Sequence, residues 1–210
     1  MATTTMQKRN IQDLIDRLRA IPSTAFTRQR VLDEIGRTVL DPSSLAPYTY
    51  FSPAHYTRNL IHCCDLFEVV ALGWERGQES AIHNHHGQEC WMGVPVGRLE
   101  VRNFRLSEHD PERRTCRLVP SIRFAIDPDR STAIDPEEQI HSAHNLQQFG
   151  SRAISVHVYS LPFQTCEVYD LDRHCYDIVR LDYTSRLGTL CPGAVAEAAG
   201  FQEPVRVERG

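Results

Sequence analysis

Histidines at two places in the chain have the spacing of metal ligands. The first group is His83 and His85, in the segment HNHHGQEC, and the second is His141 with His144, in the segment HSAHN. Side chains two residues apart on a strand point to the same face, so one metal ion can bind His83 and His85 together. A lone HxH pair is a weak signal, so the second segment matters to the interpretation.

A third group of polar residues lies on one predicted strand. In the segment AISVHVYSL, the polar residues Ser155, His157 and Tyr159 alternate with apolar ones. Because residues alternate faces along a strand, these three side chains share one face. That face is either exposed to solvent or lines a polar cavity, and the alternation alone does not decide between the two.

The elements that must position these residues are mainly strands. After Pro47, short runs rich in Val, Ile, Phe and Tyr recur, separated by Gly, Pro, Asp and Ser. The predicted strands are 67–74, 90–96, 98–106, 122–126, 153–161, 166–169 and 178–183. Many short strands at this spacing are typical of an antiparallel sandwich or barrel. We therefore predict a mainly all-β fold, with Trp74 and Trp91 filling its core.

Two helices are predicted before the strands. Apolar residues in 7–21 recur at the spacing of an amphipathic helix, and a similar pattern covers 27–40, with Thr27 as its N-cap. We see no internal repeat and no linker, so we predict one domain over 1–210. Its expected parts are a helical cap at 7–45, a β-barrel at about 48–188 and an irregular tail at 189–210.

Composition excludes several classes of protein. The 210 residues have a net charge of −4, with 41% hydrophobic and 24% charged residues, which is ordinary for a globular protein rather than a disordered one. The charges form no basic stripe, so no nucleic-acid partner is expected. No apolar run is long enough for a bilayer, and the first residues lack the apolar segment of a signal peptide. We expect a cytoplasmic monomer whose seven cysteines are free thiols.

The two histidine segments resemble the paired motifs of the cupin superfamily, a small jelly-roll β-barrel with a metal at its mouth. The first motif reads Gly, five residues, HxH, three or four residues, Glu, six residues, Gly. The positions that fit this spacing are Gly77, His83, His85, Cys90 and Gly97. Cys90 then stands where the motif has its ligand Glu. A shorter gap would place Glu89 there instead, with Gly97 out of step by one residue.

The second cupin motif supplies the remaining ligand. Pro136, His141 and Asn145 fit its spacing, although Glu138 stands where Gly is expected. The resemblance therefore implies three neutral imidazole ligands, His83, His85 and His141, and no carboxylate. Imidazole suits zinc, copper, iron and nickel about equally, so the ligand type does not identify the metal. An octahedral ion would keep three open positions, whereas tetrahedral zinc would keep one water.

Within the cupins, the chain resembles the cysteine dioxygenases over residues 56–188. The motifs that carry this resemblance are YTRNL at 56–60, GWERG at 73–77, HNHHGQEC at 83–90, HSAHN at 141–145 and SVHVYSLPFQTC at 155–166. Members of this family hold one Fe(II) on three histidines and use O2 to oxidise the thiol of L-cysteine to cysteine sulfinate. The resemblance implies the same ligands here, with L-cysteine and O2 as substrates.

The same resemblance implies roles for six further residues. It places the carboxylate-binding arginine at Arg58, with Tyr56 beside it. Near the substrate it places Tyr159, held by His157 and oriented with Ser155, so that the polar face of this strand lines the barrel interior. Some members cross-link a cysteine to this tyrosine by a thioether, and that cysteine corresponds to Cys90, where many bacterial members have Gly.

Other functions remain open from the sequence. Relatives that act on 3-mercaptopropionate carry Gln at the position of Arg58, and Arg58 therefore favours cysteine, since its planar fork pairs with a carboxylate at two points. A dioxygenase acting on another small thiol carboxylate is the first alternative. A non-catalytic metal-binding cupin and a zinc site of structural or isomerase type are the others.

Overall fold

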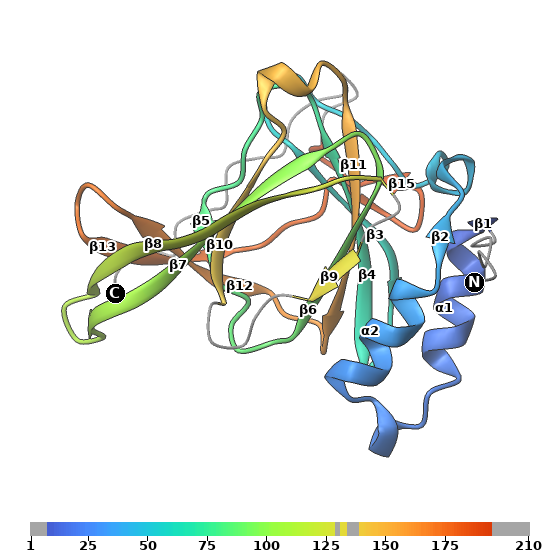
Figure 1. Cartoon of the computed structure of the whole chain (residues 1–210), viewed down its shortest axis with the longest axis horizontal. Helices are drawn as coiled ribbons and strands as arrows, with labels where there is room; N and C mark the ends of the chain where they lie inside the picture. Colours follow the sequence, from blue (N-terminus) through green and yellow to red (C-terminus); the bar gives the residue numbers. More distant parts are fainter. Residues whose placement is uncertain (1–7, 129–130, 134–138, 195–210) are drawn as a thin grey trace, which may run out of the picture.

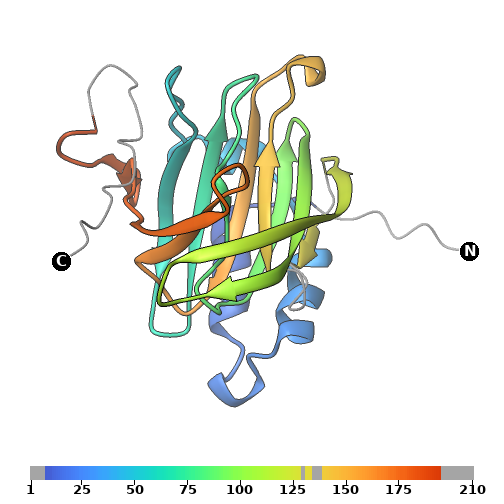
Figure 2. The same ribbon diagram turned by 90° about the vertical axis from the view of Figure 1, so that its left-hand side faces the viewer.

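The structure is a computed structural model that describes residues 8–128, 131–133 and 139–194. Within these residues, strands form two main sheets that face each other (Figures 1 and 2). One is a closed barrel with the strand order β10-β5-β12-β13-β8-β7, and the other is a 7-stranded sheet with the order β15-β14-β3-β4-β11-β6-β9. This double-stranded β-helix is the predicted cupin jelly roll, and the all-β fold class is confirmed.

The secondary-structure elements have the following bounds. The helices are α1 (Ile11–Arg19) and α2 (Arg28–Gly36), with short 3-10 turns at Ser23–Ala25, Pro42–Leu45 and Gln147–Phe149. The first strands are β1 (Lys8–Arg9), β2 (Val39–Leu40), β3 (Thr57–Cys63), β4 (Phe67–Trp74), β5 (Ile82–His83), β6 (Cys90–Val96), β7 (Leu99–Asp110) and β8 (Thr115–Ile126). The later strands are β9 (Ser131–Ala133), β10 (Ile140–His144), β11 (Ala153–Ser160), β12 (Thr165–Asp170), β13 (Cys175–Arg180), β14 (Ser185–Arg186) and β15 (Thr189–Leu190).

Both predicted helices are present but shorter than predicted. α1 begins after Asn10, whose side chain accepts hydrogen bonds from the first turn, while the Asp13 carboxylate accepts one from the Asn10 backbone N–H. Thr27 caps α2 as predicted. The prediction that this helix continues to residue 40 was wrong, because Val39 and Leu40 pair with β1 as strand β2 instead.

Sequence patterns predicted β4 and β6 with their observed bounds and found parts of β7, β8, β11, β12 and β13. They missed β3 and β10 as strands. The reason is that both strands carry polar residues into the interior: Arg58 is buried in β3, and His141 and Ser142 are buried in β10. The apolar alternation that identifies half-exposed strands is therefore absent.

The larger sheet separates two cores. Phe67, Val69 and Ala71 of β4 pack with α1 and α2, which cover the outer face of the sheet (Figure 1). On the opposite face, Val70 and Leu72 pack between the two sheets with residues of the barrel. Ser155 and His157 of β11 pair with Leu72 and Val70, and these two residues and Tyr159 are buried, so their face lines the interior, as the family resemblance implies.

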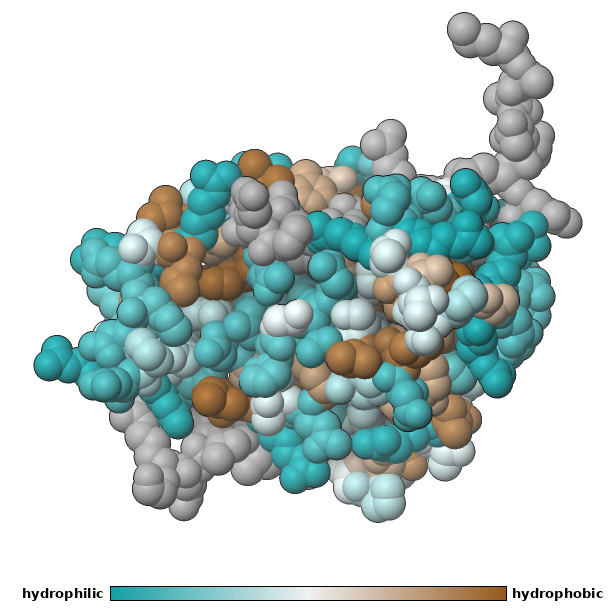
Figure 3. Space-filling model, turned by 90° about the horizontal axis from the view of Figure 1, so that it is seen from below, coloured by the Kyte–Doolittle hydropathy of each residue, from teal (hydrophilic) through white to brown (hydrophobic). Residues whose placement is uncertain are grey.

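The remaining predictions fare as follows. All seven cysteines are free thiols, as predicted. The predicted tail is not irregular at its start, because Thr189 and Leu190 form β15 against β14. Pro136 and Glu138 of the second motif, and the tail at 195–210, lie outside the described residues. Within the described part of the chain, no helix is long and apolar enough to cross a membrane. The surface seen from below is largely hydrophilic, with hydrophobic residues in small separate groups (Figure 3).

Candidate active site

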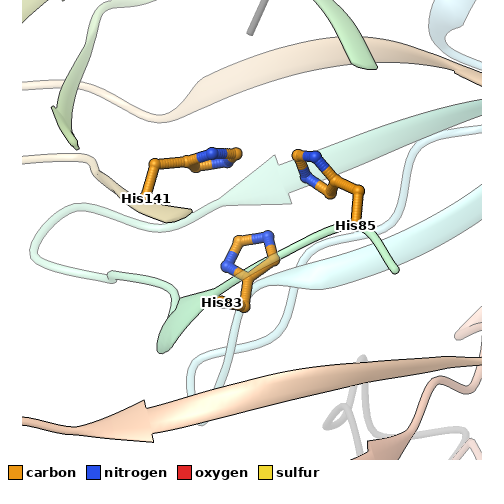
Figure 4. A group of neighbouring side chains, drawn as sticks. All are labelled: His83, His85 and His141. Atoms are coloured by element: carbon orange, nitrogen blue, oxygen red, sulfur yellow. The ribbon is translucent and has the colours of Figure 1, made fainter. Parts of the chain in front are cut away.

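Three histidine side chains converge at one end of the interior (Figure 4). The candidate ligand atoms of His83, His85 and His141 all lie within 4.8 Å of one another. His83 and His141 are direct partners in the pairing of β5 with β10. The expectation that both members of the HxH pair lie on a strand was wrong for His85, since β5 ends at His83. The turn that follows still directs His85 toward the other two rings.

These histidines are neutral and have nitrogen atoms available for a metal. Burial lowers the pKa of His83 to about 4 and lowers the pKa of His85 and of His141 well below the usual range. His83 donates its Nδ1 hydrogen to the carbonyl of Ala81 at 2.9 Å, which leaves Nε2 as a ligand atom. Neither ring nitrogen of His85 has a hydrogen-bond partner among the described residues. The donor set therefore fits a metal ion.

Hydrogen bonds between Asn84 and Glu167, which the sequence did not predict, hold the turn that contains the HxH pair. The side chain of Asn84 donates to Glu167 Oε2 at 2.7 Å and accepts from the Glu167 backbone at 3.0 Å. Tyr169 donates to the same carboxylate at 2.6 Å. Asn84 lies between the two ligand histidines, so these bonds hold the turn against β12. The spacing of Asn84 and Glu167, 83 residues apart, carries no local signal.

A cavity opens beside the histidines. It is lined by polar residues that include Tyr56, Arg58, His83, His85 and Tyr159. Apolar side chains complete its wall, namely Phe163, Val168, Val179 and Leu181, together with the thiol of Cys166. The cavity thus brings a candidate metal site and a guanidinium into one space.

Arg58 presents an unshared guanidinium to this cavity. The residue is only 4% exposed, and its Nε and Nη2 atoms have no hydrogen-bond partner among the described residues. Its backbone is fixed by Thr184, whose N–H donates to the Arg58 carbonyl at 2.7 Å. A buried guanidinium with two nitrogen atoms that the protein does not use is suited to bind a carboxylate at two points.

Ser155, His157 and Tyr159 form a hydrogen-bonded row along β11. His157 Nε2 lies 2.8 Å from Ser155 Oγ, and its Nδ1 lies 3.3 Å from the Tyr159 hydroxyl. Trp74 Nε1, which can only donate, donates to Ser155 Oγ at 2.9 Å. The donors of Trp74, Ser155 and His157 all have an acceptor if Ser155 in turn donates to Nε2 and His157 donates from Nδ1 to Tyr159. The Tyr159 hydrogen is then free to point into the cavity.

The sequence predicted that Trp74 fills the core. In the structure this side chain also supports the site. Its ring also stacks on Tyr56, with 4.6 Å between ring centroids. One buried side chain thus supports both the wall of the cavity and the start of the hydrogen-bonded row. The only sequence signal was the position of Trp74 at the end of β4, in the GWERG motif.

Cys90 and Tyr159 lie side by side inside the protein. They are direct partners in the antiparallel pairing of β6 with β11, and both are at most 2% exposed. Side chains of such a pair share a face with their Cβ atoms about 5 Å apart. Burial raises the pKa of the Cys90 thiol and the pKa of the Tyr159 hydroxyl, so both groups are protonated.

Comparison with known proteins agrees with this geometry. The chain is 27% identical over 157 residues to cysteine dioxygenase type 1 of Homo sapiens, which covers 74% of this chain and 76% of the human protein. It is 25% identical over 193 residues to cysteine dioxygenase type 1 of Danio rerio, with 90% of this chain and 94% of the fish protein covered.

Solved structures with a similar arrangement of strands are more distant. A conserved protein with a double-stranded β-helix domain from Klebsiella pneumoniae has a TM-score of 0.44 and 19% identity, and covers 56% of this chain and 87% of its own. An RmlC-like cupin protein from Desulfovibrio desulfuricans has a TM-score of 0.39 and 16% identity, and covers 55% of this chain and 91% of its own.

A family profile also matches most of the chain. The sequence profile named cysteine dioxygenase type I matches residues 1–172. This range includes the three convergent histidines, the cavity arginine and the row along β11. The chain is therefore a member of the cysteine dioxygenase type I family.

Proposed function

We propose that the protein is an iron-dependent L-cysteine dioxygenase that adds both atoms of O2 to the thiol and forms cysteine sulfinate. One Fe(II) per chain would be held by His83, His85 and His141. The observation that carries the proposal is the opening of one cavity onto both the histidine cluster and the unshared guanidinium of Arg58. We expect the whole chain to work as a monomeric cytoplasmic cupin domain.

The chemistry needs a metal, and the three neutral ligands suit it. A ferrous ion held there would supply a positive charge that lowers the pKa of a cysteine thiol and a redox-active centre for the reaction with O2. The overall reaction balances, since one thiol and one O2 give one sulfinic acid. Because burial keeps the histidines neutral, no proton has to leave them before they bind the ion.

The remaining residues bind and orient the substrate. Arg58 would take the carboxylate of cysteine in two parallel hydrogen bonds, with Tyr56 packed beside it. Tyr159, with its oxygen held by His157, would donate its hydroxyl hydrogen to the reacting sulfur or oxygen atoms. His157 itself acts as a neutral hydrogen-bond donor, since burial lowers its pKa to about 3.

A dioxygenase acting on 3-mercaptopropionate is the second candidate, because that thiol also carries a carboxylate. Arg58 favours cysteine between the two. The ratio of kcat/KM for L-cysteine and for 3-mercaptopropionate decides this question.

The experiment that tests the proposal combines metal analysis with oxygen uptake. Protein purified without added metal is expected to contain iron and to consume one O2 for each cysteine sulfinate formed, and the activity should disappear with a chelator and return with Fe(II). Iron-loaded protein that consumes no oxygen with any small thiol would point to a non-catalytic cupin. Purified protein that contains zinc, and whose oxygen uptake iron does not restore, would point to a zinc site of structural or isomerase type.

We further predict a thioether between Cys90 Sγ and the Tyr159 ring. Its formation removes one hydrogen from the thiol and one from the ring, with O2 as the oxidant, and their positions as cross-strand partners bring the two groups together. Denatured protein after turnover should be lighter by two hydrogen atoms in intact mass spectrometry. Cys90→Ala should keep its full mass, whereas Cys166→Ala, which removes another cavity thiol, should still show the loss. Complete alkylation of Cys90 in active enzyme would contradict the prediction.

A further inference from the structure

A buried carboxylate lies behind the arginine of the cavity. Glu68 is fully buried in β4 and is the direct cross-strand partner of Tyr159 in β11. Its side chain therefore points to the same interior face as Tyr159. Arg58 and Tyr159 line the cavity, but Glu68 is not among the described residues that do. The carboxylate is thus an internal part of the protein that substrate does not reach.

Tyr183 connects this carboxylate to Arg58. The Tyr183 hydroxyl donates a short hydrogen bond to Glu68 Oε2. The Tyr183 ring centroid lies 5.6 Å from the guanidinium carbon of Arg58 and 4.5 Å from that of Arg186. The two charges nevertheless do not meet, because Glu68 Oε1 and the Arg58 Nε and Nη2 atoms have no hydrogen-bond partner within the described part of the chain.

Two opposite buried charges that act on each other without a hydrogen bond between them need a restraint. The attraction between them is strong where little water penetrates, and a carboxylate is the natural partner for a free guanidinium. Burial raises the pKa of Glu68, while the Tyr183 hydrogen bond and the charges of Arg58 and Arg186 lower it. Among the described residues, the hydroxyl of Tyr183 is the hydrogen-bond partner of this carboxylate.

We propose that Tyr183 restrains Glu68 and so keeps the Arg58 guanidinium available, and that this pair sets the affinity of the site for thiols that carry a carboxylate. The inference rests on the proposed function, in which Arg58 binds the substrate carboxylate. Without the hydroxyl, Glu68 turns toward Arg58 and competes with substrate. If the internal pair then forms nine-tenths of the time, the apparent Kd rises about tenfold, since only the free fraction binds.

The test compares two thiols and four proteins. Binding of L-cysteine and of cysteamine, which lacks the carboxylate, is measured by calorimetry without oxygen on the iron-loaded protein and its Tyr183→Phe, Glu68→Gln and double variants. Tyr183→Phe should raise the Kd of L-cysteine about tenfold and leave that of cysteamine unchanged. Glu68→Gln should not weaken cysteine binding, and in the double variant the effect of Tyr183→Phe should vanish.

The matched control is Tyr176→Phe, which removes a buried tyrosine hydroxyl that contacts His109 at 3.1 Å and is not among the described residues that line the cavity. It should leave both Kd values unchanged. The proposal is overturned if Tyr183→Phe leaves the Kd of L-cysteine unchanged. It is also overturned if this variant weakens the binding of L-cysteine and of cysteamine equally. It is also overturned if the double variant binds cysteine as weakly as Tyr183→Phe. If Glu68→Gln does not fold, the two-thiol comparison with Tyr183→Phe decides alone.

The same data separate this proposal from the function on which it rests. If the wild-type protein binds and oxidises L-cysteine but Tyr183→Phe has no selective effect, only the role of Tyr183 and Glu68 is wrong. If the wild-type protein does not bind L-cysteine at all, the proposed function fails and the role of this pair fails with it.

Discussion

Replacement of His141 by alanine is expected to abolish metal binding and thiol oxidation. The three rings lie close enough to share one ion, and the loss of one ligand leaves only the HxH pair. Loss of a residue that merely supports a metal ligand typically costs about 10- to 100-fold in metal affinity, so loss of a ligand should cost more than about 100-fold. Metal content after dialysis, measured by elemental analysis, reports the effect directly, and oxygen uptake with L-cysteine reports its consequence.

A neighbouring histidine provides the control for this substitution. His86 is exposed and follows His85 directly. Its backbone has a φ of 53°, a conformation that asparagine also tolerates, so His86→Asn removes an imidazole with little strain. This variant should keep its metal and its activity. If His141→Ala keeps metal and activity as well, the three histidines are not the site of the ion.

Replacement of Arg58 by glutamine is expected to lower kcat/KM for L-cysteine roughly 100- to 1000-fold, because truncation of one partner of a buried charge pair costs several kcal/mol. The guanidinium is buried and its Nε and Nη2 atoms are not used by the protein, so the substrate carboxylate is the group that it would bind. Glutamine offers one amide donor group and no charge. Steady-state oxygen uptake over a range of cysteine concentrations measures the change.

Two comparisons make this result specific. Cysteamine lacks the carboxylate, so its kcat/KM should be nearly the same in the wild-type protein and in Arg58→Gln. The preference for L-cysteine over 3-mercaptopropionate should decrease in the variant, in keeping with the glutamine found at this position in relatives that act on mercaptopropionate. Equal losses of kcat/KM for cysteine and cysteamine would contradict the role of Arg58 in binding the carboxylate. A lower melting temperature of the variant that explains both losses would contradict it as well.

Much of the site was predictable because its signals are local. The spacing of His83 and His85 requires only that two neighbouring side chains reach one ion. Alternation in 153–160 placed Ser155, His157 and Tyr159 on one face, although the sequence left open whether that face was exposed or buried. Strands β4 and β6 were predicted with their bounds because they carry the β-rich apolar runs that sheet cores select.

Other features had no local signal. Strands β3 and β10 carry buried polar side chains, so a pattern of apolar residues does not identify them, and yet β3 carries Arg58 and β10 carries His141. Residues 39–40 continue the periodicity of a helix, but they pair with strand β1 and form a sheet instead. In both cases contacts distant in the sequence outweigh the local preference.

Residue type and short spacing predicted His83 and His85 as a candidate ligand pair, whereas His141 and Arg58 were predicted through the resemblance to the cysteine dioxygenases. The partners of the carboxylates Glu68 and Glu167, in contrast, depend on the tertiary structure. Glu68 and Tyr183 are 115 residues apart, and Asn84 and Glu167 are 83 apart. Such contacts follow from the register in which strands pair, and register is set by the packing of the whole interior rather than by any one segment.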